Sequence, residues 1–207
     1  MSTPERPLDF LGFVETLSQS GGAPHTPKYV FDIDVLSKSL EPVKPFGAGP
    51  RVSPTSTYGA ALGSDGKQYD IIVIPAGSSW IGAQEQEAVD FITKQGAKAK
   101  YVLSVCLGSG ILAASGLLDG KRATSNKMFF KEVAGVFPKV NWVPKARWVV
   151  DGKFWTGSGV TAGFDMAYAF ASELLGKEWA DKLAAFIEYK PATDPEDDEF
   201  AAVYGLV

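Results

Sequence analysis

The chain has 207 residues, of which 45% are hydrophobic and 21% are charged, and its formal net charge is −4. This composition is typical of a globular protein with one medium-sized core, so we predict a single domain over residues 1–207. The acidic balance excludes the basic surface that nucleic acid binding needs, and it would also repel an anionic membrane.

The expected compartment follows from the cysteine count and the start of the chain. The single cysteine, Cys106, excludes an intrachain disulfide. The first residues are polar and lack the apolar core of a signal peptide, and no apolar run is long enough for a transmembrane helix. We therefore expect a cytoplasmic protein.

The first third of the chain is expected to hold one helix and several short strands. Residues 8–18 place apolar side chains at helical spacing, whereas residues 29–37 alternate apolar and polar side chains like a strand. Residues 19–28 are rich in Gly and Pro and predict a loop, and residues 41–68 predict short edge strands and turns.

Strands and helices alternate through the middle of the chain. Residues 69–77 and 100–105 are short β-branched runs, which are typical of strands buried on both faces of a parallel sheet. Residues 85–99 predict an amphipathic helix, and residues 107–118 predict a helix of small residues packed close to the sheet. The fold class is therefore predicted as α/β, a flavodoxin-like open parallel sheet with helices on both faces.

The last third is expected to add a small β-hairpin and further helices. Residues 146–159 predict two strands around the turn Asp151-Gly152, and residues 160–189 predict helix with a break near Gly176. The remaining expectations are a strand at residues 121–126, a helix at 128–138 and a solvated acidic tail at 191–200.

Cys106 lies where the strand 100–105 is expected to turn into the next helix. Ligand sites of open α/β sheets lie at the carboxyl ends of the strands. A tight turn, permitted by Gly108 and Gly110, would expose the thiol as in a nucleophile elbow, and the helix N-terminus would lower the thiol pKa. The pattern equally allows a structural cysteine, because free cysteine is often buried.

Four segments of the chain together resemble the PfpI/ThiJ superfamily, which has the class I glutamine-amidotransferase-like fold. Within the superfamily, the Leu8-Asp9 motif is similar to that of the branch that hydrates isonitriles. The segments are LDFLG at residues 8–12, YDIIVIPAG at 69–77, SVCLGSGILAASGLLDGKRATSN at 104–126 and WTGSGVTAGFDMAYAF at 155–170.

The resemblance implies roles for particular residues. Cys106 would be the nucleophile, and Asp9 would be the acid beside its sulfur. The backbone N–H groups of Gly77 and Leu107 would form an oxyanion hole. Asn126 stands where many members of the superfamily carry a histidine. Thr161 and Trp80 would line the pocket.

Several of these residues also have structural interpretations. Asp9 could cap the first helix, Thr161 and Asp165 could cap or position the late helix, and Trp80 could serve in packing. The single histidine, His25, lies in a predicted loop.

The resemblance also implies an apolar strand ahead of the Leu-Asp motif. Only seven residues precede Leu8 in this sequence, and Phe13 stands where the superfamily usually has a proline. This strand is therefore expected to be very short and polar, or part of the usual core to be missing.

The resemblance implies a function as well, and the single histidine bears on it. Peptidases and glutaminases use a histidine to deprotonate the thiol and to protonate a leaving amine, whereas isonitrile hydration releases no amine. We therefore predict an isonitrile hydratase-like enzyme, which forms an N-substituted formamide through a thioimidate on Cys106. A glyoxalase III-like dicarbonyl enzyme and a redox-sensing protein with an oxidisable Cys106 are the alternatives.

The expected partners are a small-molecule substrate and a second copy of the chain. The superfamily commonly forms homodimers. No cofactor is expected, because one cysteine and one histidine are too few for an ordinary zinc site.

Overall fold

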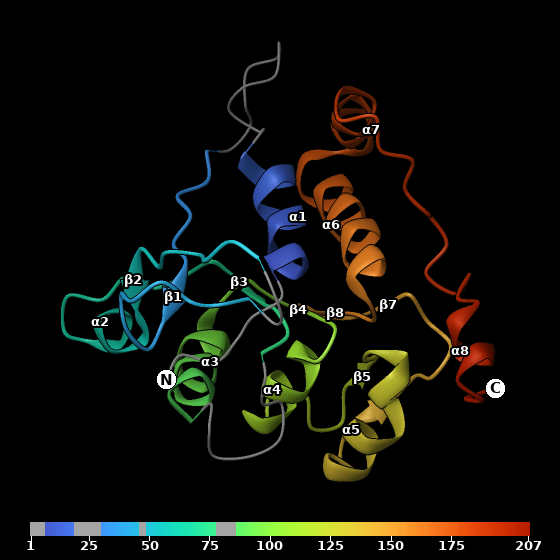
Figure 1. Ribbon diagram of the computed structural model, residues 1–207, viewed down its shortest axis with the longest axis horizontal. Coiled ribbons are helices and arrows are strands. Elements are labelled where there is room, and N and C mark those ends of the chain that lie inside the picture. The colour runs from blue at the N-terminus through green and yellow to red at the C-terminus, as the bar shows by residue number, and fades with distance from the viewer. Residues whose placement is uncertain (1–6, 19–29, 46–48, 78–85) are drawn as a thin grey trace.

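The computed structural model describes residues 7–18, 30–45, 49–77 and 86–207 (Figure 1). The main sheet has the strand order β3 (Ile71–Ile74), β4 (Tyr101–Val105), β8 (Phe154–Gly157) and β7 (Trp148–Asp151). The first three strands are mutually parallel, and β7 pairs antiparallel with β8. The predicted loop 19–28, with His25, and Trp80 lie outside the described residues.

Helices cover both faces of this sheet, as the alternation of strands and helices predicts (Figure 1). α1 (Pro7–Ser18) and α6 (Val160–Leu175) pack together on one face, whereas α3 (Gln86–Lys98) and α4 (Gly108–Ala114) lie on the other. Each face has its own apolar cluster. The α1/α6 cluster includes Phe13, Leu103, Met166 and Phe170, and the α3/α4 cluster includes Phe91, Ile92, Val102 and Leu112. The predicted α/β class with a largely parallel sheet is confirmed.

The predicted hairpin forms, but it is not an addition to the sheet. β7 and β8 flank a turn in which Gly152 has a φ of 60°, a left-handed conformation that glycine adopts without strain. β8 also pairs with β4 through a parallel register that places Val105 opposite Gly157. The hairpin therefore supplies the last two strands, β7 and β8, of the main sheet.

The prediction of a strand at residues 29–37 is largely wrong. Among the described residues 30–37, only Leu36–Ser37 form a strand, β1, which pairs in parallel with β2 (Ser56–Thr57). A short helix, α2 (Tyr58–Leu62), follows β2 where turns were expected. Its N-terminus is capped by the Thr57 hydroxyl, which accepts the N–H of Ala60 at 3.1 Å.

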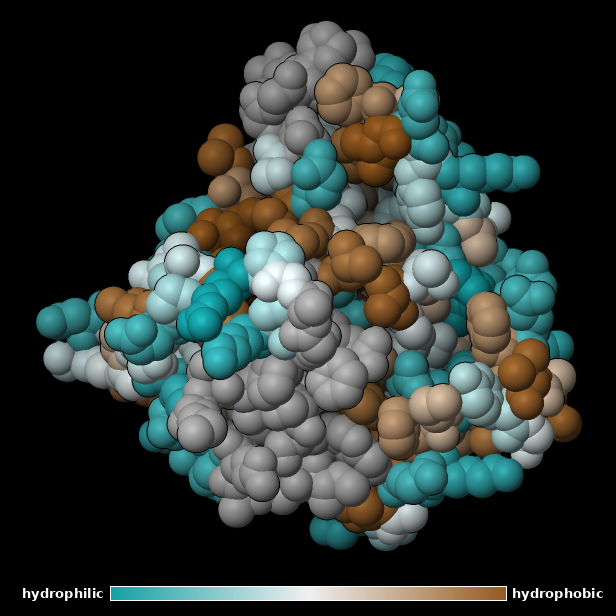
Figure 2. Space-filling view, in the orientation of Figure 1, coloured by the Kyte–Doolittle hydropathy of each residue, from teal (hydrophilic) through white to brown (hydrophobic). Residues whose placement is uncertain are grey.

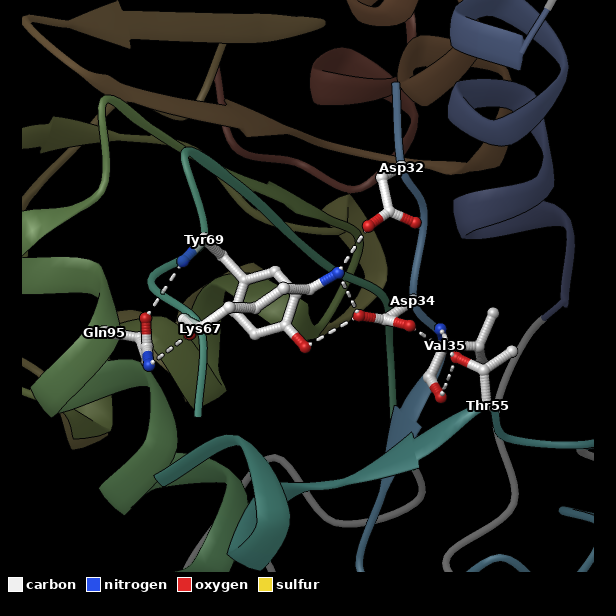
Figure 3. Close-up of polar contacts among 7 residues, drawn as sticks. All are labelled: Asp32, Asp34, Val35, Thr55, Lys67, Tyr69 and Gln95. Carbon is white, nitrogen blue, oxygen red and sulfur yellow. Dashed lines mark hydrogen bonds and ion pairs between the residues drawn. The ribbon is translucent and has the colours of Figure 1, made fainter. Parts of the chain in front are cut away.

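Side-chain contacts explain how residues 30–36 are held without a longer strand (Figure 3). Lys67 Nζ lies 2.8 Å from Asp32 and 2.7 Å from Asp34, and the Tyr69 hydroxyl donates to Asp34 at 2.9 Å. Gln95 on α3 accepts the N–H of Tyr69 at 3.1 Å. Burial, reinforced by the hydrogen bond to Asp34, raises the pKa of Tyr69 to about 12.

An apolar cavity of about 210 Å³ lies beside β3, on the side away from β4. In the part of the chain that the structure describes, β3 is the last strand of the main sheet on this side. Figure 2 shows apolar atoms gathered between α1 and β1. The cavity is walled by side chains of α1, α3, β3 and the segment before β1, among them Phe13, Leu17, Phe31, Val35, Ile71, Val73 and Phe91.

The remaining described elements are two short strands, a 3-10 helix and three α-helices. The predicted break at Gly176 is confirmed, because this residue has a φ of 98° and separates α6 from the next helix. The prediction that residues 191–200 form a solvated edge is wrong for Asp198, which is buried. The elements of this remaining part of the chain are β5 (Arg122–Ala123), η3 (Lys127–Phe129), α5 (Phe130–Val136), β6 (Asn141–Trp142), α7 (Lys177–Phe186) and α8 (Phe200–Val203).

Candidate active site

Cys106 forms the turn between β4 and α4. Its φ of 59° lies in the left-handed region, which a non-glycine residue rarely adopts. The N–H of Cys106 donates to the carbonyl oxygen of Gly157 at the end of β8, at 3.0 Å. A Cβ atom at Gly108 would lie 2.1 Å from the carbonyl oxygen of Ile74, so only glycine fits there. The turn therefore holds Cys106 in a strained conformation, as a nucleophile elbow does.

Two buried serines hold the carbonyl group of Cys106. The Ser109 hydroxyl donates to this oxygen at 3.0 Å and pairs with the Ser125 hydroxyl at 2.9 Å. Ser125 itself lies 3.5 Å from the same oxygen. Sequence reasoning missed this pair. Both serines lie in segments that carry the resemblance, but nothing in their spacing indicates that they meet.

The Cys106 side chain is only 3% exposed, so the expectation of an exposed thiol is wrong. It nevertheless lines a cavity of about 290 Å³ at the carboxyl end of the sheet. The thiol is therefore reachable through a cavity and is not displayed on the surface. The other residues that line the cavity are Leu107, Asn126, Lys127, Met128, Phe129, Arg147, Ser158, Gly159, Thr161, Ala162, Phe200 and Tyr204.

Asp9 lies in the first turn of α1 and is only 1% exposed. Because α1 begins at Pro7, Asp9 is inside the helix, and its interpretation as the N-cap is wrong. Its Oδ2 accepts the N–H of Ala76 at 3.1 Å. A Cβ atom at Gly108 would lie 2.1 Å from the carbonyl oxygen of Ile74 and 2.8 Å from that of Pro75, so the Cys106 turn approaches these two residues closely. Asp9 and the Cys106 turn therefore lie against neighbouring residues of one segment, 74–76, which ends β3 and follows it, although Asp9 is not among the residues that line the Cys106 cavity.

The other residues singled out from the sequence are only partly brought together. Leu107, Asn126 and Thr161 line the cavity with Cys106, whereas Gly77 follows β3 and borders the apolar cavity. The Asn126 side chain caps η3 by accepting the N–H of Met128 at 3.1 Å. The catalytic and binding roles given to these residues stay predictions.

Two basic residues of the cavity were missed by sequence reasoning. Arg147 donates through Nε to Asp165 at 2.8 Å and also contacts it through Nη2. Lys127 Nζ lies 3.1 Å from Asp198, and both side chains are buried. Burial lowers the pKa of Lys127, and the carboxylate of Asp198 opposes this effect. Lys127 begins the short helix η3 and Arg147 lies in the connection from β6 to β7, and neither segment is long enough to have a periodic pattern.

Neither a metal centre nor a membrane span is found in residues 7–18, 30–45, 49–77 and 86–207. No three His, Cys, Asp or Glu side chains among these residues are grouped as metal ligands would be. None of the helices in these ranges is both long enough and apolar enough to span a bilayer.

Comparison with known proteins places the fold and the elbow in a family. The sequence profile of the DJ-1/PfpI family matches residues 29–173. The chain belongs to this family. This DJ-1/PfpI protein is 37% identical over 163 residues to an isonitrile hydratase from Pseudomonas putida, an alignment that covers 77% of this chain and 67% of the relative. The resemblance found in the sequence is thereby confirmed.

Other members and solved structures extend the comparison. The chain is 26% identical to the HTH-type transcriptional regulator CdhR from Pseudomonas aeruginosa, covering 73% of this chain and 47% of that protein. A THiJ/PfpI family protein from Pseudomonas syringae has a TM-score of 0.75 and 30% identity, covering 93% of this chain and 74% of the other. DJ-1beta from Drosophila melanogaster, at 20% identity and a TM-score of 0.72, shares the fold over 92% of this chain and 95% of the other.

Proposed function

We propose that this DJ-1/PfpI protein adds water to an isonitrile and releases an N-substituted formamide. The observation that carries the proposal is that Asp9, through Ala76, and the Cys106 turn, through Gly108, both lie against residues 74–76 at the end of β3. The 37% identity to an isonitrile hydratase supports the same reaction.

The chemistry starts with the Cys106 thiolate and a protonated Asp9. The sulfur attacks the terminal carbon of the isonitrile while Asp9 protonates that carbon, which gives a thioimidate and leaves Asp9 as a carboxylate. Asp9 is buried and is the carboxyl group assigned to act as the acid in this step.

Water then completes the reaction. The Asp9 carboxylate takes a proton from water, the hydroxide adds to the thioimidate carbon, and the proton passes to the nitrogen. The tetrahedral adduct collapses as the C–S bond breaks, which releases the formamide and the thiolate. The hydroxyl proton returns to Asp9, so that both groups end in their starting states. The N–H groups of Gly77 and Leu107 are assigned to stabilise charge on the adducts.

Formamide production from methyl and phenyl isonitrile tests the proposal. We expect no turnover by Cys106→Ala and a loss of about 10²–10⁴-fold in Asp9→Asn, the usual size of an acid–base contribution. Glu87→Gln is the matched control, because Glu87 is also in the first turn of a helix but is exposed. Its activity should equal that of the wild type.

Two other outcomes would overturn the proposal. If the wild type converts no isonitrile but forms lactate from methylglyoxal, the protein is a dicarbonyl enzyme. If it converts neither substrate, and dilute peroxide oxidises Cys106 to a stable sulfinate seen by mass spectrometry, the redox alternative replaces it.

A further inference from the structure

The mouth of the Cys106 cavity carries four apolar side chains that the proposed chemistry does not use. Met128 and Phe129 come from η3, and Phe200 and Tyr204 come from α8 and the residue that ends it. Their exposed fractions lie between 37% and 58%, although all four line the cavity. We call these four residues the apolar collar.

A buried ion pair fixes the two halves of the collar to each other. Lys127, which begins η3, pairs with Asp198 and also donates to the Ala146 carbonyl at 2.6 Å. Asp198 in turn accepts the N–H of Phe200 at 3.1 Å, at the start of α8. The N–H of Arg147 donates to the carbonyl of Pro195 at 2.7 Å, which also holds this terminal segment beside the cavity. The collar is therefore part of the folded structure.

The charges that line the cavity are neutralised within the protein. Apart from the Cys106 thiolate of the proposed mechanism, the charged side chains among the lining residues are those of Lys127 and Arg147, and each pairs with a carboxylate that is almost completely buried. A ligand that carried its own charge would have to compete with these pairs. The cavity therefore suits a neutral ligand with a polar reactive end near Cys106 and an apolar part against the collar.

We propose that the apolar collar binds the substituent of the substrate, so that the site selects uncharged isonitriles that carry an aromatic or bulky alkyl group. This inference rests on the proposed function and names the substrate class for the same site. Aromatic walls supply large apolar contact areas and edge-to-face contacts to a ring, whereas a methyl substituent would hardly reach them.

The test compares the double variant Phe200→Ala/Tyr204→Ala with the wild type. Val203→Ala is the control, because Val203 is an exposed residue of the same helix that does not line the cavity. We expect the double variant to raise the KM for phenyl isonitrile about tenfold and that for methyl isonitrile less than about twofold. Equal changes for both substrates, or the same changes in Val203→Ala, would overturn the proposal.

A second readout needs no isonitrile turnover. N-phenylmaleimide and N-methylmaleimide both alkylate thiols, and we expect their rate ratio at Cys106 to fall about tenfold in the double variant only. If the wild type converts no isonitrile but this ratio falls, the proposed function fails while the collar stands as a binding surface. If the rate ratio is unchanged and the double variant alters the oligomeric state, the four residues form an interface between two copies of the chain. The collar proposal would then be wrong.

Discussion

At the scale of single residues, the backbone turn at Cys106 was easier to predict than the side-chain pairs between residues far apart in the sequence. Cys106 stands between a β-branched run and Gly-Ser-Gly, and this local pattern predicts the turn that the structure has. The partner of Lys127 is Asp198, which lies 71 positions further along the chain. No spacing rule relates two such residues. The sequence therefore located the candidate nucleophile but not the charged pairs around its cavity.

Gly108 provides a sharp test of the elbow. Alanine there would bring a Cβ atom within 2.1 Å of the Ile74 carbonyl oxygen, a backbone atom that cannot move alone. We expect Gly108→Ala to lower the free energy of unfolding by about 3 kcal/mol, measured by urea denaturation. The shifted turn should also change the rate at which iodoacetamide alkylates Cys106.

Gly135→Ala is the control for that substitution. Gly135 lies in α5, and nothing lies within 4 Å of the position that its Cβ would take. This variant should be more stable than the wild type by about 0.5–1 kcal/mol, because alanine is the better helix former. If both variants changed stability alike, the close contact at Gly108 would not constrain the turn.

At the scale of elements, prediction succeeded where a pattern was long enough to repeat. α3 has 13 residues and α6 has 16, and their apolar side chains recur over several turns. β1, β2, β5 and β6 have two residues each, which is too short for any alternation to be seen. Their pairing is decided by tertiary contacts, such as those of Asp34 with Lys67 and Tyr69.

The attachment of α8 depends on the Lys127–Asp198 pair. Asp198→Asn would leave the Lys127 ammonium buried without its counter-charge, and we expect a loss of about 3–5 kcal/mol in the free energy of unfolding at pH 7. Asp197→Asn is the matched control, since Asp197 is exposed, and it should have almost no effect.

The pH dependence of the Asp198→Asn variant has a definite sign. Burial already lowers the pKa of Lys127 in the folded protein, and loss of Asp198 removes the main influence that opposes this shift. Between the lowered folded pKa and the unfolded value near 10.5, the unfolded chain binds more protons, so stability rises with pH. The deficit relative to the wild type should therefore be smaller at pH 9.5 than at pH 7. A deficit that did not change with pH would contradict this account of the pair.

At the scale of the whole molecule, the family resemblance predicted more than the residue patterns alone. It implied an apolar strand ahead of Leu8, and the structure has an apolar cavity beside β3 on the side toward α1. It did not predict that the acidic carboxyl-terminal segment reaches the Cys106 cavity. The composition of residues 191–200 is that of a solvated tail, but the burial of Asp198 and the hydrogen bond from Arg147 to the Pro195 carbonyl hold the segment against the protein.

The prediction that residues 1–207 form one domain can be tested through the sheet that its two cores share. Val102 belongs to the α3/α4 cluster and Leu103 to the α1/α6 cluster, and the two residues are neighbours on β4. Adjacent strand residues point to opposite faces, so losing β4 removes the support of both clusters at once. The two faces should therefore unfold together.

Native-state hydrogen exchange measures whether they do. We expect the most protected amides of α3 and α6 to exchange with the same free energy of opening. Leu103→Ala should lower both values equally, by about 2–5 kcal/mol, although Leu103 belongs to the α1/α6 cluster. If α6 lost protection while α3 kept it, the two faces would unfold as separate units. The chain would then have two cooperative units on one sheet, and the single-domain prediction would be wrong.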